Sequence, residues 1–202
     1  MEYITAHYMQ GEGRFLVLQK YSVRTIPICV ACIGIEPDRE KRTKLAESLR
    51  MWTEQFPWRK LAAKPAAWKQ EARMQLCALM QGSKAEIVVC VENEVLLLRW
   101  EAPHLHTDRF ISAYVICGCF GQGHAERINA AFDGRIEPGA GVLIADSDYL
   151  KRTDEKTLGQ VLRLFGPVTE EKAQKHLSEI AQGTDGLAIL LIAREEAPAD
   201  GR

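Results

Sequence analysis

Residues 136–146 read Ile136-Glu-Pro-Gly-Ala-Gly-Val-Leu-Ile-Ala-Asp146. The proline and glycine predict a turn, and residues 141–145 then predict a buried β-strand that ends at Asp146. Asp148 follows two residues later. Carboxylates at the end of a strand are good ligands for hard divalent cations, which prefer oxygen donors. The segment therefore predicts either a metal ligand or an aspartate that caps a turn.

A further aspartate stands before the last apolar segment, which reads Gly183-Thr-Asp185-Gly-Leu-Ala-Ile-Leu-Leu-Ile192. Glycines on both sides of Asp185 predict a turn, and residues 187–193 predict a strand. Asp146 and Asp185 thus stand at the ends of two apolar strands, and both are candidate metal ligands.

Apolar runs bounded by glycine, proline and polar residues predict strands over much of the chain. The expected strands cover residues 3–9, 14–20, 25–35, 86–91, 95–100, 110–117, 127–135, 141–145 and 187–193. Gly11 and Gly13 permit a tight turn, so we expect the first two of these strands to form a hairpin.

Apolar residues at three- and four-residue spacing predict helices over residues 38–55, 65–80, 153–165 and 169–182. The helices come in two consecutive pairs, which disfavours a doubly wound parallel sheet. We predict an α+β fold, an α-β-β-α sandwich of two antiparallel sheets flanked by helix pairs. Residues 1–194 are expected to form a single domain, and residues 195–202 a frayed C-terminal tail.

Composition excludes several classes of protein. The length of 202 residues suits one domain, and the 47% hydrophobic and 26% charged residues argue against disorder. A formal net charge of −1 gives no general attraction to nucleic acid or to a membrane, so neither is an expected partner. Apolar runs reach about ten residues, whereas a membrane span needs roughly 20. No signal peptide is visible, so we expect a cytoplasmic protein.

The cysteines allow two interpretations. Cys29 and Cys32, and likewise Cys117 and Cys119, have spacings that resemble halves of a zinc or redox site. Positions three apart on a strand point to opposite sides, so Cys29 and Cys32 are better explained as reduced, buried, small hydrophobic residues.

Two further segments are candidate binding sites. Residues 118–123 are rich in glycine after a strand, but they lack the lysine and serine or threonine of a phosphate-binding loop, so we expect a turn. His104, His106 and Asp108 lie close enough in sequence to chelate a metal, or they belong to a solvated polar loop.

The two aspartate segments resemble the late part of the metal-dependent serine/threonine phosphatases of type 2C. There the usual run is L-x-P-G-D-x-L-L-L-x-S/T-D-G-L, followed by S/T-D-E-E, and the domain closes with D-N-x-T-V-I-x-I. Residues 136–146, the Thr153-Asp-Glu that follows and residues 183–192 are similar to these motifs. The resemblance extends over nearly the whole chain and implies the same α-β-β-α sandwich.

The resemblance also implies a chemistry. In that family two divalent ions, bridged by one carboxylate, activate a water molecule that attacks the phosphate. By position Asp146 and Asp185 match metal ligands, and Glu12 matches the glutamate of the N-terminal R-x-x-N-E-D motif. A residual site on these three residues would take manganese or magnesium.

Several required positions differ from the family pattern. Cys32 stands where the bridging aspartate of V-A-D-G-x-G-G is expected, and a soft thiol is a poor bridge for magnesium or manganese. Gly13 replaces the aspartate of N-E-D, Tyr8 replaces the phosphate-holding arginine, and Ser147 replaces the glycine after Asp146. The resemblance therefore implies a degenerate member of the family that needs no cofactor.

Glu36 or Asp38 is the alternative for the missing bridge. We therefore keep three hypotheses. The first is a pseudophosphatase, a signalling or regulatory module that binds a protein partner such as a phosphoprotein or a kinase. The second is an active manganese- or magnesium-dependent phosphoprotein phosphatase with a rearranged metal site. The third is a sandwich of unrelated ancestry.

If the chain binds a partner, Trp52, Trp58 and Trp68 are the aromatic candidates for the interface, with helix-face core residues as the alternative.

Overall fold

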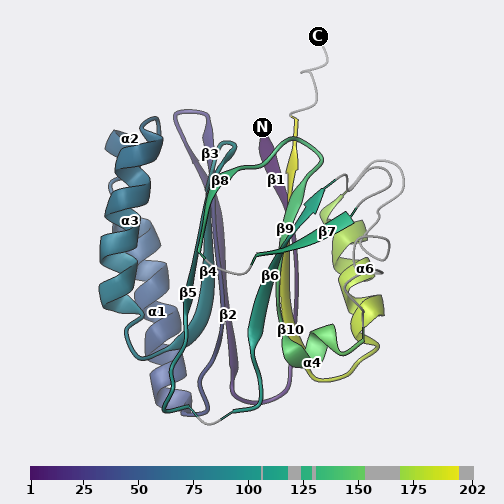
Figure 1. Ribbon diagram of the computed structural model, residues 1–202. Helices are drawn as coiled ribbons and strands as arrows, with labels where there is room; N and C mark the ends of the chain where they lie inside the picture. Colours follow the sequence, from purple (N-terminus) through teal and green to yellow (C-terminus); the bar gives the residue numbers. More distant parts are fainter. Residues whose placement is uncertain (106, 118–123, 129–130, 153–168, 196–202) are drawn as a thin grey trace.

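Two β-sheets pack face to face in the computed structural model, and helices cover the outer face of each sheet (Figure 1). The structure describes residues 1–105, 107–117, 124–128, 131–152 and 169–195. Its layers follow the order helix, sheet, sheet, helix, so the predicted α-β-β-α sandwich of antiparallel sheets is confirmed.

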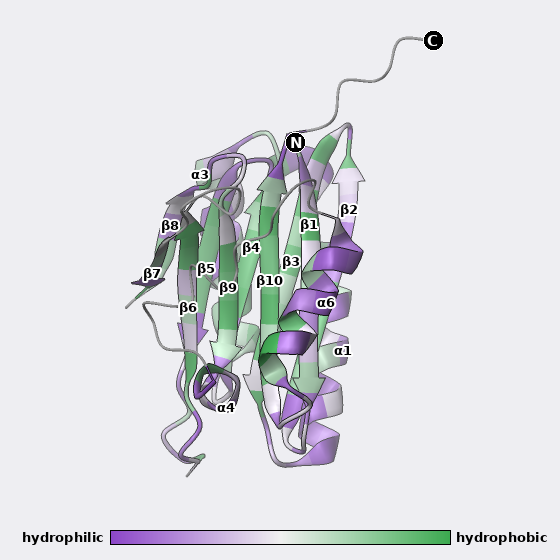
Figure 2. Cartoon of the chain, turned by 90° about the vertical axis from the view of Figure 1, so that its right-hand side faces the viewer, coloured by the Kyte–Doolittle hydropathy of each residue, from purple (hydrophilic) through white to green (hydrophobic). Residues whose placement is uncertain are grey.

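One sheet carries both of the aspartate-bearing segments. Its antiparallel strands lie in the order β1 (Glu2–Gln10), β10 (Gly186–Arg194), β9 (Gly141–Asp146), β6 (Ile111–Cys117) and β7 (His124–Ile128). In β10, Leu187 and Ile189 face the other sheet, whereas Ala188 and Leu190 face the helix outside. Both faces of β10 are buried, which explains why its sequence is apolar without alternation (Figure 2).

The other sheet contains β2 (Arg14–Val23), β3 (Ile26–Ile35), β4 (Lys84–Val91), β5 (Glu94–Trp100) and β8 (Phe132–Arg135), in that order. Cys29 of β3 lies in the core between the sheets, whereas Cys32 lies in the core beneath the helices. Both thiols are buried and free, and burial raises the pKa of Cys29 to about 12. These two cysteines are therefore core residues on opposite faces. The side chain of Cys117 and all of Cys119 lie outside the described residues.

Three helices cover the sheet of β2: α1 (Arg39–Gln55), α2 (Trp58–Leu61) and α3 (Pro65–Leu79). The other sheet is covered by α4 (Ser147–Leu150) and α6 (Glu170–Ala181). The predicted helices over 38–55, 65–80 and 169–182 are confirmed, and the one over 153–165 lies outside the described residues. No helix in the described part of the chain is long and apolar enough to cross a membrane.

Two predicted strand arrangements are wrong. The strands at 3–9 and 14–20 form no hairpin, because β1 pairs with β10 and β2 pairs with β3, in different sheets. Gly11 and Gly13 have φ values of +94° and +75°, so their turn carries the chain from one sheet to the other. The single strand expected over 127–135 is divided between β7 and β8, which also belong to different sheets.

The three tryptophans are not exposed. Trp52, Trp58 and Trp68 are 8%, 3% and 0% exposed. Their rings pack together beneath the helices, with centroids 6.1 Å apart for Trp52 and Trp58 and 6.3 Å apart for Trp58 and Trp68. The expectation that they are exposed is therefore wrong, and their helix-face positions serve the core.

Candidate functional site

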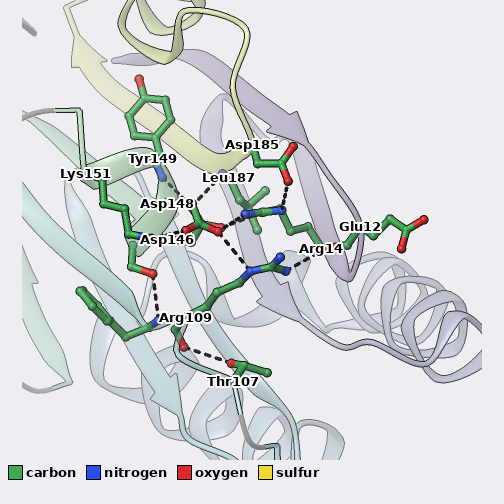
Figure 3. A network of polar contacts seen from close by, with 12 residues as sticks. Glu12, Arg14, Thr107, Arg109, Asp146, Asp148, Tyr149, Lys151, Asp185 and Leu187 are labelled. Atoms are coloured by element: carbon green, nitrogen blue, oxygen red, sulfur yellow. Dashed lines mark hydrogen bonds and ion pairs between the residues drawn. The ribbon is translucent and has the colours of Figure 1, made fainter.

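Asp146 and Asp185 converge at one end of the sandwich (Figure 3). Asp146 is the last residue of β9, and Asp185 immediately precedes β10. The two strands are antiparallel neighbours, so the end of one lies beside the start of the other. The backbone N–H of Leu187 in β10 donates to Oδ1 of Asp146 at 3.0 Å. The two candidate ligands named from the sequence therefore lie at one place in the fold.

Every oxygen of the Asp146 carboxylate accepts a hydrogen bond from the protein. Oδ1 accepts from the backbone N–H groups of Leu187 and Tyr149, both at 3.0 Å, and so caps the start of α4. Oδ2 accepts from Nε of Arg14 at 2.7 Å. The Asp146 and Arg14 side chains are both fully buried, so this is a desolvated ion pair that links the two sheets.

Arg14 holds three carboxylates around one guanidinium group. Besides Nε on Asp146, Nη2 donates to Oδ2 of Asp148 at 2.5 Å, and Nη1 lies 3.8 Å from Oδ2 of Asp185. That buried Nη1 has no hydrogen-bond partner among the described residues. Asp185 is 59% exposed and forms the outer side of the cluster. The guanidinium thus lies between the two aspartates that were predicted as metal ligands.

Strand alternation directs Arg14 to this position. Arg14 is the first residue of β2 and pairs with Ile35 of β3. Leu16 and Leu18 pack in the core between the sheets, and Phe15 packs beneath the helices. Residues 14, 16 and 18 share one face of a strand, so Arg14 points at the opposite sheet and its aspartates.

The turn before β2 leaves room for the guanidinium. Gly11 faces the Arg14 side chain, and a Cβ atom at Gly11 would lie 2.4 Å from Nη1 of Arg14 and 2.6 Å from Cγ of Asp185. Such distances are shorter than real contacts, so a side chain at Gly11 would displace Arg14 or Asp185, and the positive φ adds backbone strain.

Asp148 connects the cluster to two further cations. Lys151 Nζ lies 2.8 Å from Oδ1 of Asp148, and Nε of Arg109 lies 3.1 Å from Oδ2. The hydrogen bond from Lys151, reinforced by the positive charges of Arg14 and Arg109, holds the pKa of Asp148 below its ordinary value. Arg109 also donates through Nη1 to the backbone oxygen of Glu12 at 3.0 Å.

This cluster does not fit a pair of divalent cations. Three side-chain cations already face three carboxylates, so the charges of Asp146, Asp148 and Asp185 are balanced within the protein. Among the described residues, no group of three or more histidine, cysteine, aspartate or glutamate side chains is arranged to hold a metal ion. His104 and Asp108 are among the described residues and belong to no such group. His106 and the glycine-rich residues 118–123 lie outside the described part.

Glu12 does not join the aspartates. Its side chain is exposed and points away from Arg14, and only its backbone oxygen takes part in the cluster (Figure 3). Gly13, which follows, has a positive φ, and its carbonyl accepts the backbone N–H of Glu36 at 2.8 Å.

Tyr8 and Ser147 have structural contacts near the site. The hydroxyl group of Tyr8 donates to the backbone oxygen of Thr184 at 2.6 Å, next to Asp185. Ser147 Oγ accepts the backbone N–H of Phe110 at 3.3 Å, and the Ser147 N–H donates to the Phe110 oxygen at 2.8 Å. Both residues therefore hold loops that flank the aspartates.

Cys32 lies apart from the cluster. It pairs with Val17, three residues along the strands from the pair of Arg14 and Ile35, and its side chain belongs to the core on the far side of the sheet. The residue after the end of β3 is Glu36, whose Oε1 accepts the backbone N–H of Asp38 at 3.0 Å.

Asp38 caps α1. Its Oδ1 accepts the N–H groups of Glu40 at 2.9 Å and Lys41 at 3.1 Å. The two residues proposed as a replacement bridge, Glu36 and Asp38, thus take part in the helix start.

Sequence reasoning missed Arg14, which organises the site. The only signal was a charged residue at the start of a run whose alternate members are apolar. That pattern shows that Arg14 lies on the same face of the strand as Leu16 and Leu18. The carboxylates that Arg14 binds depend on which strand of the other sheet lies opposite.

Comparison with known proteins finds similar solved structures. No family model matches the chain, and no curated protein matches it. A crystal structure of a bacterial serine phosphatase superposes with a TM-score of 0.61 at 12% identity, covering 96% of this chain and 99% of that one. The serine/threonine phosphatase of S. agalactiae gives 0.53 at 10% identity, covering 96% and 100%.

A third similar structure holds metal. It is the catalytic domain of the serine/threonine protein phosphatase PstP in complex with two manganese ions. Its TM-score is 0.52 at 11% identity, and the match covers 96% of this chain and 99% of that domain.

Proposed function

We propose that this chain, which has the fold of the type 2C serine/threonine phosphatases, is a pseudophosphatase: it does not hydrolyse phosphoesters and acts by binding another protein. One observation carries the proposal. The guanidinium of Arg14 is buried between Asp146, Asp148 and Asp185 and supplies the positive charge that these carboxylates need. A fixed organic cation balances charge, but it cannot lower the pKa of a bound water molecule as paired metal ions do.

The remaining donors support the same conclusion. Metal binding at Asp146 would require Oδ2 to exchange a 2.7 Å bond to Arg14 for an ion, while Oδ1 already accepts two backbone N–H groups. The displaced guanidinium would remain buried without its partner, and an unpaired buried charge is strongly destabilising. The Glu12 carboxylate points away from Asp146 and Asp185, so it adds no third ligand to these two aspartates.

The likeness to a manganese-bound phosphatase domain favours one alternative, a phosphatase with a rearranged metal site. Isothermal titration with MnCl2 and hydrolysis of p-nitrophenyl phosphate distinguish the two. We expect no heat of site binding and no turnover above the buffer rate. Binding of two manganese ions, with turnover that the Asp185→Asn variant abolishes, would overturn the proposal.

Asp185→Asn is the suitable control for that assay. The Asp185 side chain is 59% exposed, and its ion pair with Arg14 is 3.8 Å long, so the substitution removes a carboxylate with little effect on folding. A phosphothreonine peptide assayed in parallel tests whether a larger substrate restores turnover.

A further inference from the structure

The edge strands β1 and β2 lie together at one side of the sandwich, but only one of them is protected. Helix α6 lies beside the free edge of β1 (Figure 2), and its side chains form hydrogen bonds with the backbone of that edge. Gln174 accepts the N–H of His7 at 3.0 Å and donates to the His7 carbonyl at 2.6 Å, as a neighbouring strand would. Glu170 accepts the N–H of Thr5 at 3.3 Å. This cover prevents another chain from adding to β1.

The edge of β2 has no such cover in the part of the chain that the structure describes. β2 is the terminal strand of its sheet, and β3 is its only partner among the described strands. A cavity of about 770 Å³ lies beside this edge strand. It is lined by residues 18–21 and 23 of β2, and by residues 53, 54 and 56–60 at the end of α1 and in α2. At about 3.3 Å per residue, residues 18–23 of β2 extend for about 20 Å.

The cavity has an apolar floor. Tyr21, Phe56 and Trp58 line it, and the Tyr21 and Trp58 rings meet edge to face with centroids 6.1 Å apart. The polar atoms of these rings are satisfied, because the Tyr21 hydroxyl and Trp58 Nε1 donate to the backbone oxygen of Thr53 at 3.1 and 2.9 Å. Phe56 and Trp58 are mostly buried, so the accessible apolar surface of the floor comes mainly from the half-buried Tyr21 and Val23.

The rim of the cavity is basic. Arg59 and Lys60 are adjacent and exposed, and neither has an ion-pair partner among the described residues. Lys20 is also on the rim, but it pairs with Glu170. Of the described residues that line the cavity, Glu54 alone is acidic. The unpaired positive charge favours an acidic ligand.

We propose that the free edge of β2 binds an extended acidic segment of a partner protein as an added strand, with a large apolar side chain in the cavity beside Trp58 and a carboxylate at Arg59 and Lys60. Backbone hydrogen bonds to β2 supply affinity, and the cavity and its rim supply specificity. The proposal rests on the binding half of the proposed function and is independent of the loss of catalysis.

Other occupants fit the surface less well. Two copies of the chain joined through their β2 edges would bring the basic rims of both copies together, and like charges repel. Residues 195–202 are acidic, but their sequence, Glu-Glu-Ala-Pro-Ala-Asp-Gly-Arg, contains no large apolar side chain for the cavity. A helix in the groove would leave the N–H and C=O groups of the β2 edge unpaired.

A phage-displayed library of random ten-residue peptides, selected on the full chain, tests the proposal. We expect enriched peptides in which an acidic residue stands near an aromatic or large aliphatic residue. Fluorescence polarisation then gives the Kd of one labelled peptide. The Arg59→Glu/Lys60→Glu double variant should weaken binding at least about tenfold, since it reverses the charge of the rim.

The matched control reverses two exposed charges at the other end of α1. Arg39→Glu/Lys41→Glu should leave the Kd within about twofold of the wild type, because these residues lie in the first turn of the helix, far from the cavity. Failure to enrich peptides, or equal binding by both double variants, would overturn the proposal. So would self-association of the chain that excludes the peptide.

N-methylation of the peptide tests the strand geometry. Methyl groups on one set of alternate residues should abolish binding, and methyl groups on the other set should not, because alternate N–H groups face β2. Equal sensitivity of both sets would exclude strand addition. A chain that binds the peptide and also hydrolyses p-nitrophenyl phosphate would disprove the loss of catalysis while leaving this inference intact.

Discussion

Arg14 and Asp146 form a buried ion pair that joins the two sheets of the sandwich, with Nε of Arg14 2.7 Å from Oδ2 of Asp146. The residues are far apart in sequence, at the start of β2 and the end of β9. Neither side chain contacts solvent, so each charge depends on the other for compensation. Loss of either partner would therefore leave the other charge buried and uncompensated.

Substitution Arg14→Ala should lower the free energy of unfolding by about 3–5 kcal/mol, because it leaves Asp146 charged, buried and without its partner. Urea unfolding followed by circular dichroism measures the loss. In an Asp146→Asn background the same substitution should cost less, since no charge is then left unpaired. Arg135→Ala is the control: Arg135 binds Glu94 from a side chain that is 70% exposed, so its loss should cost below about 1 kcal/mol.

Removal of Arg14 should create a cation site. Without the guanidinium, the oxygens of Asp146, Asp148 and Asp185 face one another with an excess of negative charge, and hard divalent ions bind such oxygens. MnCl2 should raise the melting temperature of Arg14→Ala and leave that of the wild type unchanged. Adding Asp185→Asn should reduce the rise. An equal rise in the wild type would contradict the idea that Arg14 occupies this place.

Substitution Gly11→Ala should destabilise the fold more than Gly183→Ala does. Both glycines have positive φ, +94° and +71°, so alanine is strained at either position. A Cβ at Gly183 meets nothing within 4 Å, whereas one at Gly11 would lie 2.4 Å from Nη1 of Arg14. The difference in urea midpoints therefore reports crowding of the Arg14 cluster, and equal losses would show that only backbone strain matters.

Lys69 should make stability depend on pH. Its Nζ lies 2.6 Å from Oδ1 of Asp133 and 2.7 Å from Oε2 of Glu94. These two ion pairs join α3 to β8 and β5. The hydrogen bond from Lys69 lowers the pKa of Asp133. For Glu94, burial raises the pKa, but hydrogen bonds from Lys69 and Arg135 outweigh it and lower the pKa overall.

Carboxyl groups with lowered pKa in the folded state stabilise it above their unfolded pKa, and this contribution disappears as the pH falls through the folded pKa. The urea midpoint of the wild type should therefore fall between about pH 5 and pH 2. Lys69→Met should have a lower midpoint at pH 7 and a flatter decline in acid. Parallel curves for the two proteins would exclude this role of Lys69.

The sequence by itself determined most of the elements, because helical and strand periodicity are local properties. The spacing of Leu49 and Trp52 located α1, and the apolar segment after Asp185 located β10. The order of elements, together with the resemblance of two aspartate segments, predicted the sandwich. The four-residue helices α2 and α4 were not predicted, since one turn is too short to show a period.

Only the tertiary structure decided which strands pair and what Arg14 binds. The glycine turn at residues 11–13 is compatible with a hairpin or with a crossing between sheets, and the choice depends on β10, which lies at the other end of the chain. Because the turn crosses between the sheets, the Arg14 side chain lies between them and binds Asp146 instead of contacting solvent. Strand pairing and charge compensation join residues that are distant in sequence, so no local pattern carries them.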